Sequence, residues 1–519
     1  MADIVLINPR FETSYWGMEH AMGFFGKAAN QPVACLPLLA ALTPQPHRVT
    51  LIDENVEAID FERCARADIV GVTGMIVQRA RMREIIEELK RRGCFVVVGG
   101  PWITVKEDYF GALADAIFIG EAEQTWPQFL RDWQAGSPAP RYEQAEKTDM
   151  STVPVPRFEL LKMDRYLVGS LQFSRGCPFN CEFCDIIVVF GRRPRIKTAP
   201  QVLAELDALV ANGMDTAFIV DDNLIGNKKA IKPLLRAVCD WQERRGYPLL
   251  FFTEASIDLA DDGELMALMV EANIQVVFVG IETPNEAALR ETRKFQNVRK
   301  GATMLEKVHA IQKAGMEVWS GMILGFDSDD AGIFDLQKQF IERSSIVNTM
   351  IGMLSAIPRT PLYERLQREG RLDEGDFQPL GTNVLPRQID RQALRDGYLQ
   401  LMDDLYRPGP YFARLDALYL HGGLGRRNGV TRYLARHRWR RLRESVAQAI
   451  EATVLFARLM RGVGDARLRG EYRRQILKAA RRLRDPMAVL IYAIKCAMHY
   501  HIVTMMAQMR TRDRIINSF

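Results

Sequence analysis

The stretch Phe173-Ser-Arg-Gly-Cys-Pro-Phe-Asn-Cys-Glu-Phe-Cys184 spaces three cysteines, Cys177, Cys181 and Cys184, as Cys-x-x-x-Cys-x-x-Cys. Glycine, proline and asparagine among them predict a turn-rich loop, and three of the chain's eight cysteines fall within these eight residues. A free cysteine is often a reduced core residue, but such clustering favours metal binding. No nearby histidine or fourth cysteine completes a zinc site. Three thiolates on one loop can instead bind three corners of a four-iron, four-sulfur cluster.

Three cysteines leave the fourth iron of such a cluster without a protein ligand. An open iron can be chelated by S-adenosylmethionine, which a reduced cluster can cleave to a 5'-deoxyadenosyl radical. The loop, including the aromatic Phe183 before the last cysteine, resembles the signature of the radical S-adenosylmethionine superfamily. That resemblance implies a 4Fe-4S cluster on Cys177, Cys181 and Cys184, with Phe183 beside S-adenosylmethionine.

Length and composition are those of a globular protein with about three domains. The 519 residues are 48% apolar and 26% charged, and apart from the cluster loop the cysteines are scattered. Scattered cysteines predict a reducing cytoplasm rather than a disulfide-bonded secreted protein. The N-terminal stretch Ala2–Arg10 lacks the basic and apolar regions of a signal peptide, so we expect a first strand there.

Charge is distributed unevenly along the chain. Residues 426–519 contain 22 Lys/Arg against 6 Asp/Glu, a net charge of +16. Because the whole chain carries +5, the preceding 425 residues carry −11. A basic C-terminal lobe on an acidic body predicts an anionic partner.

The first 145 residues alternate between predicted strands and helices. The expected strands are 3–8, 48–52, 69–73, 95–98 and 116–119, and a helix is expected over 78–92. Short apolar strands separated by helices predict a parallel, doubly wound sheet, with ligands over the carboxyl ends of the strands.

This first part also resembles a cobalamin-binding domain. The resemblance rests on "VVVGGPW" (96–102) and "IFIGEAEQTW" (117–126), which precede the cysteine loop in the chain. It implies that five residues contact cobalamin: Thr73, Gly99, Gly100, Gly120 and Glu121. The alternative is a Rossmann-like domain that has lost its cofactor.

One departure from the cobalamin-binding pattern concerns the lower cobalt ligand. The Asp-x-His-x-x-Gly motif is absent, and His20 is the sole histidine in the loop after the first strand. The resemblance therefore implies cobalamin bound without a histidine below the cobalt.

After a linker at 146–165, residues 166–385 predict six strand–helix units of a partial barrel. The expected strands are 168–173, 216–220, 249–253, 275–279, 318–323 and 349–356, and helices are expected at 200–211, 228–245 and 300–314. Polar residues cluster where these strands end, as the chemistry of a barrel requires. By resemblance, the S-adenosylmethionine contacts are Asp221, Asp222, Glu254, Glu282, Gly321, Ile323 and Gly325. The sequence has Asp221-Asp222-Asn223 where the superfamily usually has Gly-Gly-Glu.

Residues 386–519 predict an α-helical domain. Arginine-rich helices are expected at 431–459 and 470–484, and the apolar stretch 488–508 has nearly the length of a membrane span. Lys495, His499 and His501 interrupt it, so we expect a buried or interfacial helix.

The order of the three parts, with "DENVE" (53–57), "GFDSDD" (325–330) and "RPGPYFARL" (407–415), resembles one group of cobalamin-binding radical S-adenosylmethionine proteins. That group has a helical C-terminal domain of unknown function and includes hopanoid methylases and tetrapyrrole enzymes. The resemblance implies an α/β protein with a Rossmann-like domain, a partial (β/α)6 barrel and a helical domain. It also implies three cofactors: a 4Fe-4S cluster, S-adenosylmethionine and methylcobalamin.

The function implied is C-methylation of an unactivated carbon in a lipid or other hydrophobic molecule, with a ferredoxin or flavodoxin as electron donor. A radical cyclase, oxidase or rearrangement enzyme that uses cobalamin differently is the alternative. An RNA-modifying enzyme is a distant one, because the basic helices lack a stacking sheet or an RNA-binding module. We expect a cytoplasmic enzyme, with peripheral membrane contact through the basic lobe.

Overall fold

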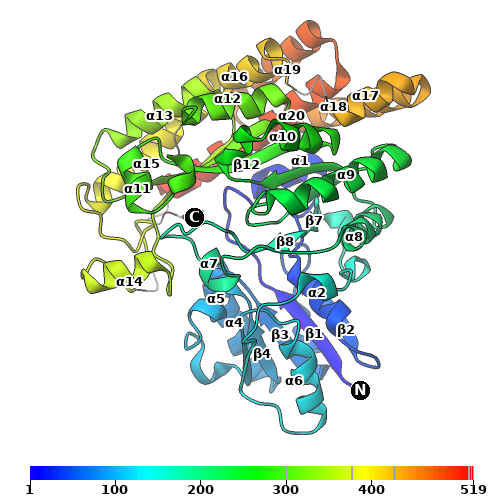
Figure 1. The fold of residues 1–519 in the computed structure, drawn as a ribbon, viewed down its shortest axis with the longest axis vertical. Helices are drawn as coiled ribbons and strands as arrows, with labels where there is room; N and C mark the ends of the chain where they lie inside the picture. Colours follow the sequence, from blue (N-terminus) through cyan, green and yellow to red (C-terminus); the bar gives the residue numbers. More distant parts are fainter. Residues whose placement is uncertain (299–300, 376–377, 425–427, 512–514, 516, 518–519) are drawn as a thin grey trace.

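The computed structural model describes residues 1–298, 301–375, 378–424, 428–511, 515 and 517. It contains two parallel sheets and a C-terminal set of helices (Figure 1). In Figure 1 the N-terminal sheet lies at the bottom, the second sheet above it, and the C-terminal helices, in orange and red, along the top. The predicted α/β fold with a helical C-terminal part is confirmed.

Six parallel strands form the N-terminal sheet, in the order β2-β1-β3-β4-β5-β6. They are β1 (Asp3–Asn8), β2 (Arg48–Asp53), β3 (Ile69–Thr73), β4 (Val96–Gly99), β5 (Ala116–Ile119) and β6 (Arg141–Glu143). The sequence analysis did not predict β6, because a three-residue strand with one buried side chain, Tyr142, carries no readable alternation. All carboxyl ends meet at one edge of the sheet, where ligands of such folds bind.

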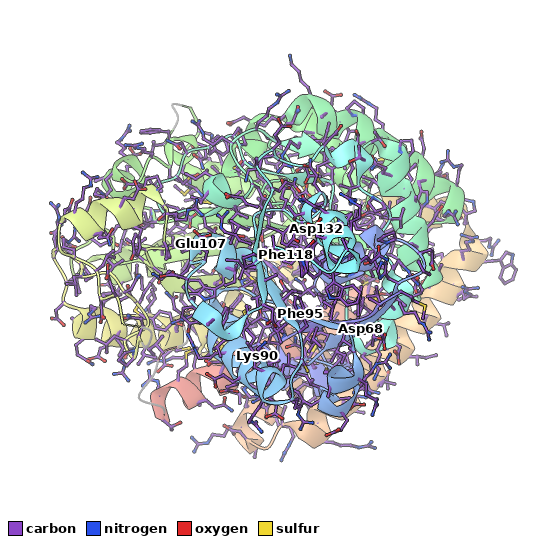
Figure 2. The ribbon with its side chains drawn as sticks, turned by 90° about the horizontal axis from the view of Figure 1, so that it is seen from below. Asp68, Lys90, Phe95, Glu107, Phe118 and Asp132 are labelled. Carbon is purple, nitrogen blue, oxygen red and sulfur yellow. The ribbon has the colours of Figure 1, made fainter. Side chains whose placement is uncertain are left out.

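Helices cover both faces of the N-terminal sheet. On one face, α4 (Arg79–Arg91) packs Met82 and Ile85 against the sheet. On the other face, α2 (Cys35–Leu42) and α6 (Thr125–Gln134) pack their buried apolar side chains against it. Figure 2, seen from below, shows Lys90 and Asp132 on either side of Phe118. The smaller elements are α3 (Phe61–Arg66), α5 (Pro101–Val105) and the 3-10 turns Ile76–Gln78 and Gly111–Leu113.

The second sheet holds six parallel strands in the order β14-β13-β12-β11-β10-β7. They are β7 (Gly169–Leu171), β10 (Thr216–Ile219), β11 (Leu250–Glu254), β12 (Ile274–Glu282), β13 (Glu317–Leu324) and β14 (Thr349–Met353). Each predicted strand is present, and their sequential order is that of a partial barrel with helices outside.

Helices follow the strands on the outside of the barrel, and three of them match the predicted helices. They are α8 (Ala199–Ala211), α9 (Lys228–Arg245), α10 (Gly263–Glu271), α11 (Glu286–Glu291), α12 (Met304–Ala314), α13 (Ile333–Ser344) and α14 (Pro361–Arg368), with 3-10 turns at Ile257–Asp261 and Phe295–Asn297. The predicted start of one helix at residue 300 is too early, although residue 300 itself lies outside the described residues. The Thr303 hydroxyl accepts from Glu306 N at 3.2 Å and Glu306 accepts from Thr303 N at 2.7 Å, a capping box that fixes the start of α12.

The predicted linker at 146–165 packs tightly against the N-terminal sheet. It forms three 3-10 turns, Met150–Thr152, Phe158–Leu160 and Met163–Arg165. Phe158 is buried, and just beyond the linker the buried Tyr166 hydroxyl donates to Asp53 Oδ2 at 2.8 Å. The cysteine loop follows, framed by the antiparallel pair β8 (Ser174–Arg175) and β9 (Arg195–Ile196) and containing α7 (Ile186–Val189).

The C-terminal helices are α15 (Arg391–Tyr406), α16 (Pro408–Leu415), a π-helical turn (Asp416–His421), α17 (Gly429–Arg436), α18 (Arg438–Gly462), α19 (Ala466–Leu483) and α20 (Pro486–Thr511). The prediction of one helix over 431–459 is wrong, because His437 separates α17 from α18. Its backbone leaves the helical region (φ −123°, ψ 72°), and its ring stacks 4.1 Å from that of Tyr433. His437 Nδ1 donates to Tyr433 O at 2.8 Å, which satisfies a carbonyl at the end of α17.

Helix α20 is a core helix. Within the described residues it is the single helix long and apolar enough to cross a membrane, with a mean hydropathy of 1.3, but 67% of that stretch is buried in the protein. The polar residues that interrupt it are satisfied: buried Lys495 Nζ donates to Glu317 Oε1 at 2.5 Å and to Asn348 Oδ1 at 2.7 Å. The expectation of a buried rather than membrane-spanning helix is met.

Helix α1 (Glu19–Phe25) belongs to the first part of the sequence but packs with the C-terminal helices. The Phe24 ring lies 5.3 Å from that of Tyr500, and Arg458 donates to Phe24 O at 3.0 Å. In Figure 1 this dark blue helix lies in the upper half, apart from the N-terminal sheet. Both sheets and the C-terminal helices therefore contribute to one continuous core, and the boundaries at 145, 165 and 385 stay predictions.

Candidate functional site

The cysteine loop is anchored by the end of β10. Asp221 accepts hydrogen bonds from the backbone N–H of Phe173 at 2.7 Å and of Ser174 at 2.8 Å. Asp222 accepts from Gly176 N at 3.0 Å. Because burial dominates, the pKa of Asp221 rises to about 6 and that of Asp222 to about 7. Asp221, predicted to contact S-adenosylmethionine, has both its oxygens engaged in holding the loop.

Gly176 allows the loop to fold back on itself. Its φ is +93°, and a Cβ there would stand 2.8 Å from Gly191 O. Cys177 N donates to the same carbonyl at 3.3 Å. A side chain at position 176 would therefore be strained by its backbone conformation and by contact with backbone atoms.

The three cysteines lie where polar groups approach their sulfurs. Asn223 Nδ2 is 3.8 Å from Cys177 Sγ, and Gln296 Nε2 is 3.5 Å from Cys181 Sγ. In the described part of the chain, no group of three or more Cys, His, Asp or Glu side chains lies close enough together to bind a single metal ion. The ligands of a cluster each reach a different iron, so they need not converge on one point.

Two further predicted carboxylates face the space beside the loop. The Glu254 carboxylate, at the end of β11, receives no hydrogen bond from a described residue, and burial followed by repulsion from Asp222 and Asp221 raises its pKa to about 8. At the end of β12, Glu282 accepts from Lys294 Nζ at 2.5 Å, while its other oxygen is buried without a partner among the described residues. Glu282 has a φ of +65°, and the structure holds this non-glycine residue in that conformation at the site. Both carboxylates therefore offer acceptor oxygens to a hydrogen-bond donor of a ligand.

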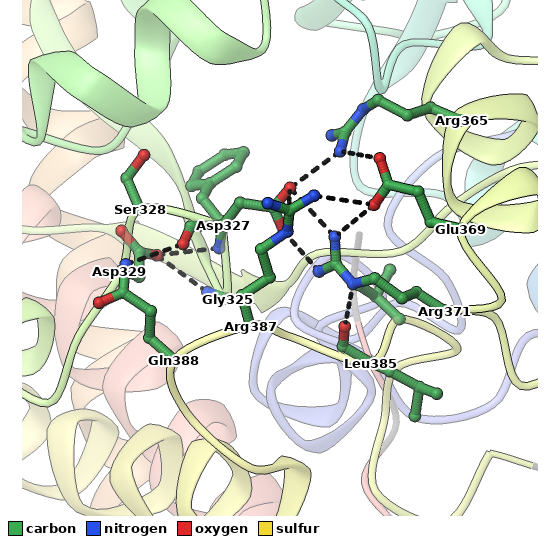
Figure 3. Close-up of polar contacts among 12 residues, drawn as sticks. Gly325, Asp327, Ser328, Asp329, Arg365, Glu369, Arg371, Leu385, Arg387 and Gln388 are labelled. Carbon is green, nitrogen blue, oxygen red and sulfur yellow. Dashed lines mark hydrogen bonds and ion pairs between the residues drawn. The ribbon is translucent and has the colours of Figure 1, made fainter.

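The end of β13 is held by the "GFDSDD" segment (Figure 3). Asp329 Oδ2 accepts from Gly325 N and Phe326 N, each at 3.0 Å, and Gly325 has a φ of +95°. Burial alone would raise the pKa of Asp327, but Arg371 and Arg365 lower it overall. The predicted Gly321 and Ile323 precede this turn within β13.

Arg365 of α14 links this turn to the cysteine loop. It pairs with Asp327 at 2.8 Å and with Glu182, which lies between the second and third cysteines, at 3.2 Å. The predicted Phe183 packs against the apolar cluster that contains Ile323, and its ring lies 6.2 Å from that of Phe326. The structure thus brings Phe183, Ile323 and Gly325 to one apolar corner beside the loop.

Below the carboxylates, four aromatic rings face the inside of the barrel. Phe251 and Ile219 point outward to the helices, so their strand neighbours point inward. The inward rings are half-buried: Phe218 stacks on Phe252 at 4.6 Å, and Phe252 lies 6.2 Å from Trp319. We call Phe218, Phe252, Phe278 and Trp319 the aromatic wall.

Trp16, from the loop after β1, completes this lining. Its ring lies 5.0 Å from Phe278 and 6.5 Å from Trp319. Neighbouring His20 belongs to α1, where its Nε2 is 3.3 Å from Gln508 Oε1 of α20. The loop that carries the lower-ligand histidine in familiar cobalamin domains is therefore directed into the barrel and toward α20.

The carboxyl edge of the N-terminal sheet brings the predicted cobalamin residues together. Gly100 has a φ of +101°, and a Cβ there would meet Thr73 Oγ1 at 2.5 Å. Gly99 ends β4, and Gly120, with a φ of +81°, donates to Thr104 Oγ1 at 3.0 Å. Strands β3, β4 and β5 are neighbours in the sheet, so bare backbone lines one edge.

Apolar side chains extend this edge. Met75 and Val77, directly after β3, are exposed. Cys35 has an accessible side chain, yet burial raises its pKa to about 11, with Thr73 and Arg175 as neighbours. Cys35 therefore lies near Thr73 of β3 and Arg175 of the cysteine loop.

Glu121 joins the two sheets. Its carboxylate pairs with Arg175 of the cysteine loop at 2.8 Å and with Arg195 of β9 at 3.0 Å, and it accepts from Thr148 N at 2.9 Å. Burial opposes ionisation, but Arg175 and Thr148 lower the pKa of Glu121 overall. Its predicted contact with cobalamin stays a prediction, while its described contacts fix the position of the cysteine loop over the N-terminal edge.

Three family matches follow this architecture. Residues 30–130 match the B12 binding domain, residues 171–338 the radical SAM superfamily, and residues 360–514 a domain of unknown function (DUF4070). The chain is 42% identical to an uncharacterized methyltransferase of Synechocystis sp., over 79% of this chain and 77% of that protein. It is 35% identical to the hopanoid C-2 methylase of Rhodopseudomonas palustris, over 80% of this chain and 79% of that protein.

The chain belongs to the cobalamin-dependent radical S-adenosylmethionine methylases. Two solved structures share its fold. OxsB with aqua-cobalamin bound has a TM-score of 0.61 at 13% identity, covering 97% of this chain and 80% of that chain. TsrM from Kitasatospora setae, with cobalamin and a [4Fe-4S] cluster, has a TM-score of 0.57 at 17% identity, covering 77% and 85%. The methylase is thus a radical C-methyltransferase that uses a 4Fe-4S cluster, S-adenosylmethionine and cobalamin.

The residues of the methylase fit these cofactors. Three thiols share one loop without a fourth ligand, which suits a cluster with one open iron. Among the described residues, one buried Glu282 oxygen and the Glu254 carboxylate accept no hydrogen bond, which suits the ammonium of S-adenosylmethionine. The glycine edge and exposed Met75 offer bare backbone and apolar surface to a corrin.

Sequence analysis missed several residues of this site. Lys294, Arg365 and the aromatic wall come from elements distant in sequence, and single residues of these types carry no motif. The aromatic residues within the strand segments "TAFI" and "LFFTE" were a weak signal for the wall, because a strand places alternate residues on one face. Arg175 and Arg195 carry no motif either, yet the structure places them in buried ion pairs with Glu121.

Proposed function

We propose that the methylase transfers a methyl group to an unactivated carbon of a polycyclic lipid of the hopanoid type. The observation that carries this proposal is the aromatic wall, which lies inside the barrel beside Glu254 and Glu282. An sp3 C–H bond has no acidity for a side chain to exploit, so radical chemistry is required. When bound, the three cofactors supply radical generation and methyl donation.

The chain's own residues bind and position the cofactors. Cys177, Cys181 and Cys184 hold the cluster, and Asp221 and Arg365 hold their loop. Glu282 and Glu254 receive the ammonium of S-adenosylmethionine, while Phe183 and Gly325 lie against its adenine. On the facing edge, Thr73, Gly99, Gly100 and Gly120 hold cobalamin.

The wall suits a rigid hydrocarbon better than a polar molecule. Its half-buried rings offer apolar contact and no hydrogen-bond partners except Trp319 Nε1, which donates to Glu317 at 2.9 Å. Lys495 lies 5.0 Å from the centre of the Trp319 ring, on the side of α20. A fused-ring skeleton buries large apolar area against such rings at little entropic loss.

Two further relatives support a ring-shaped substrate. The chain is 25% identical to the hopanoid C-3 methylase of Methylococcus capsulatus and 24% identical to a bacteriochlorophyllide d methyltransferase of Chlorobaculum tepidum. A tetrapyrrole would also stack on the wall, so it is the second candidate. We further propose a cytoplasmic enzyme, an external ferredoxin or flavodoxin as reductant, and peripheral contact with the membrane that stores the lipid.

The test begins with protein made anaerobically with cobalamin supplied, in which iron and corrin contents are measured. The loaded enzyme then receives S-adenosylmethionine with a deuterated methyl group, a flavodoxin reducing system and a hopanoid dissolved in detergent. A hopanoid heavier by one deuterated methyl group is expected. A methylated tetrapyrrole without a methylated hopanoid overturns the lipid assignment, and a product that has lost hydrogens without gaining a methyl overturns methylation.

A matched pair of variants tests the wall. Phe252→Ala removes a ring between Phe218 and Trp319, and we expect KM for the hopanoid to rise at least tenfold while the iron content is unchanged. Phe295→Ala, at an exposed aromatic outside the barrel, is the control and should match the parent protein. Equal KM values for both variants would exclude the wall as the substrate surface.

A further inference from the structure

The outer face of α18 carries a continuous apolar stripe. Five large side chains project from it at intervals of three and four residues, which places them on one side of a helix. Their exposed fractions are Trp439 78%, Leu442 56%, Val446 51%, Ile450 60% and Val454 42%. These five make up nearly half of the exposed large hydrophobic residues in the described part of the chain. We call them the α18 stripe.

The stripe is not needed for packing within the chain. On the opposite face of the same helix, Ala452, Leu455 and Leu459 are buried in the core shared with α1 and α20. These contacts fix the C-terminal half of α18, while the residues before Glu451 are mostly exposed. In Figure 1 helices α17 and α18 extend outward at the upper right, beyond the barrel helices. An apolar surface of this extent on a charged helix marks an interaction site.

The charges around the stripe identify the partner. Arg438 and Arg443 have no ion-pair partner among the described residues, and the acidic residues of α18 are Glu444 and Glu451 alone. On neighbouring α19, Arg473 and Arg481 are likewise without an ion pair in the described part of the chain. Arginines beside an apolar stripe complement a surface that is apolar within and anionic outside. That surface is a bilayer containing anionic lipid.

We propose that α18 is a membrane-docking helix that lies in the plane of the bilayer interface, with the α18 stripe in the acyl region and the arginines at the phosphates. The stripe from Trp439 to Val454 is about 22 Å long at about 1.5 Å per residue, which suits a helix lying flat. Trp439 takes the interfacial position that tryptophan prefers. This proposal refines the peripheral contact of the proposed function but does not depend on the identity of the substrate.

Docking through α18 would orient the whole enzyme. The buried half of α18 packs on α20, and Lys495 of α20 is bonded to Glu317 at the start of β13. The docked helix is therefore joined to the barrel by a buried contact rather than by a tether. A lipid substrate would leave the bilayer beside the body of the protein that methylates it.

The experiment uses full-length protein and vesicles of phosphatidylglycerol and phosphatidylcholine, with no substrate present. The parent protein should sediment with these vesicles, and its tryptophan emission should be quenched by brominated lipid. The triple variant Leu442→Ser, Val446→Ser, Ile450→Ser should lose at least tenfold in partitioning. Trp439→Phe should still sediment but lose most of the lipid-dependent quenching. Leu336→Ser, at an exposed leucine of α13, is the control and should behave as the parent protein.

Two results would overturn the proposal. One is a triple variant that sediments as well as the parent; because these side chains are exposed, its circular dichroism should match the parent and exclude misfolding. The other is a lipid-free dimer of the parent that the triple variant converts to a monomer, which would assign the stripe to a second copy of the chain. Methylation of a detergent-dissolved hopanoid is measured separately, so a failure of the proposed substrate leaves the docking result intact.

Discussion

At the scale of single residues, the site depends on a few side chains that are buried at electrostatic expense. Burial raises the pKa of Asp221, Asp222 and Glu254. Repulsion between these neighbouring carboxylates adds to the rise for Asp222 and Glu254. The burial of Asp221 has a structural explanation, because its carboxylate accepts a hydrogen bond from the backbone of the cysteine loop. The burial of Glu254 has no such explanation, because its carboxylate receives no hydrogen bond from a described residue. A buried acid of this kind is usually retained for a ligand.

Glu254→Gln should stabilise the cofactor-free methylase, and more so at high pH. The folded-state pKa of about 8 lies above the usual value of 4.5, so the folded protein binds this proton more tightly than the unfolded one. The unfavourable contribution of Glu254 therefore grows as pH rises from about 4.5 to 8. Denaturant unfolding should show a gain of about 1–3 kcal/mol at pH 8.5 that shrinks at pH 6. Glu264→Gln, at an exposed pair with Arg236, should show no such trend.

The same variant should weaken binding of S-adenosylmethionine about tenfold, because a charge-assisted hydrogen bond contributes roughly 1.5–3 kcal/mol. Equilibrium dialysis of the cluster-loaded protein measures this. Unchanged binding would remove Glu254 from the ammonium site and leave Glu282 as the remaining acceptor.

Gly176→Ala should destabilise the cysteine loop by about 2–4 kcal/mol, because it combines a left-handed backbone with a clash against Gly191 O. We expect less than half of the parent iron content after anaerobic reconstitution, together with a lower thermal midpoint. Gly93→Ala separates the two causes, since Gly93 has a φ of +77° but no atom within 4 Å of its Cβ position. If both variants bind iron equally, the close approach at Gly176 is unimportant.

At the scale of elements, ion pairs fix how the two sheets face each other. Glu121, at the end of β5, pairs with arginines on either side of the cysteine loop. Arg359, after β14, donates to Thr104 O of α5 at 2.7 Å. The carboxyl edges of the two sheets are thus held opposite each other, with the predicted cluster and cobalamin residues on facing sides.

Glu121→Gln should be strongly destabilising, by about 3–5 kcal/mol, because it leaves buried Arg195 without its charge partner and Arg175 with Glu123 alone. Limited proteolysis should cut the variant faster between residues 144 and 150. A parallel change at an exposed pair, Glu159→Gln beside Arg157, should alter the unfolding free energy by less than about 0.5 kcal/mol. Similar effects of the two changes would mean that the junction is held by packing alone.

At the scale of the whole molecule, the C-terminal helices complete the barrel rather than sit beside it. α20 places Lys495, His499 and Tyr492 in the interior, and Tyr419 of the π-helical turn donates to Glu317 Oε2 at 2.6 Å. α1 crosses from the first part of the chain to pack on α20 and α18. The molecule therefore has one core assembled from three regions of sequence.

A chain ending at residue 385 should not fold. It would expose the barrel surface that α15 and α20 cover and leave Glu317 buried without Lys495. We expect aggregation on expression and loss of the far-ultraviolet signature of the folded barrel in any soluble fraction. Co-expression of residues 386–519 should restore soluble protein, whereas a well-folded 1–385 fragment would show that the barrel is independent.

The sequence alone determined the two parallel sheets, the cysteine loop and the cofactor class, because each depends on local patterns: apolar strands, turn residues and fixed cysteine spacing. It also located the strand ends that carry Asp222, Glu254 and Glu282. It could not predict that His437 breaks a helix or that β6 exists, since both depend on a single packed residue.

Only the tertiary structure decided which side chains meet. The pairing of Glu121 with Arg175, the bridge of Arg365 from α14 to the cysteine loop, and the entry of Trp16 into the barrel each join segments more than fifty residues apart. The exposure of the α18 stripe is of the same kind: its periodicity shows an apolar face, but only the packing of the opposite face on α20 shows that this one is left to solvent. Such contacts are set by the global packing of the chain, for which a local sequence pattern carries no signal.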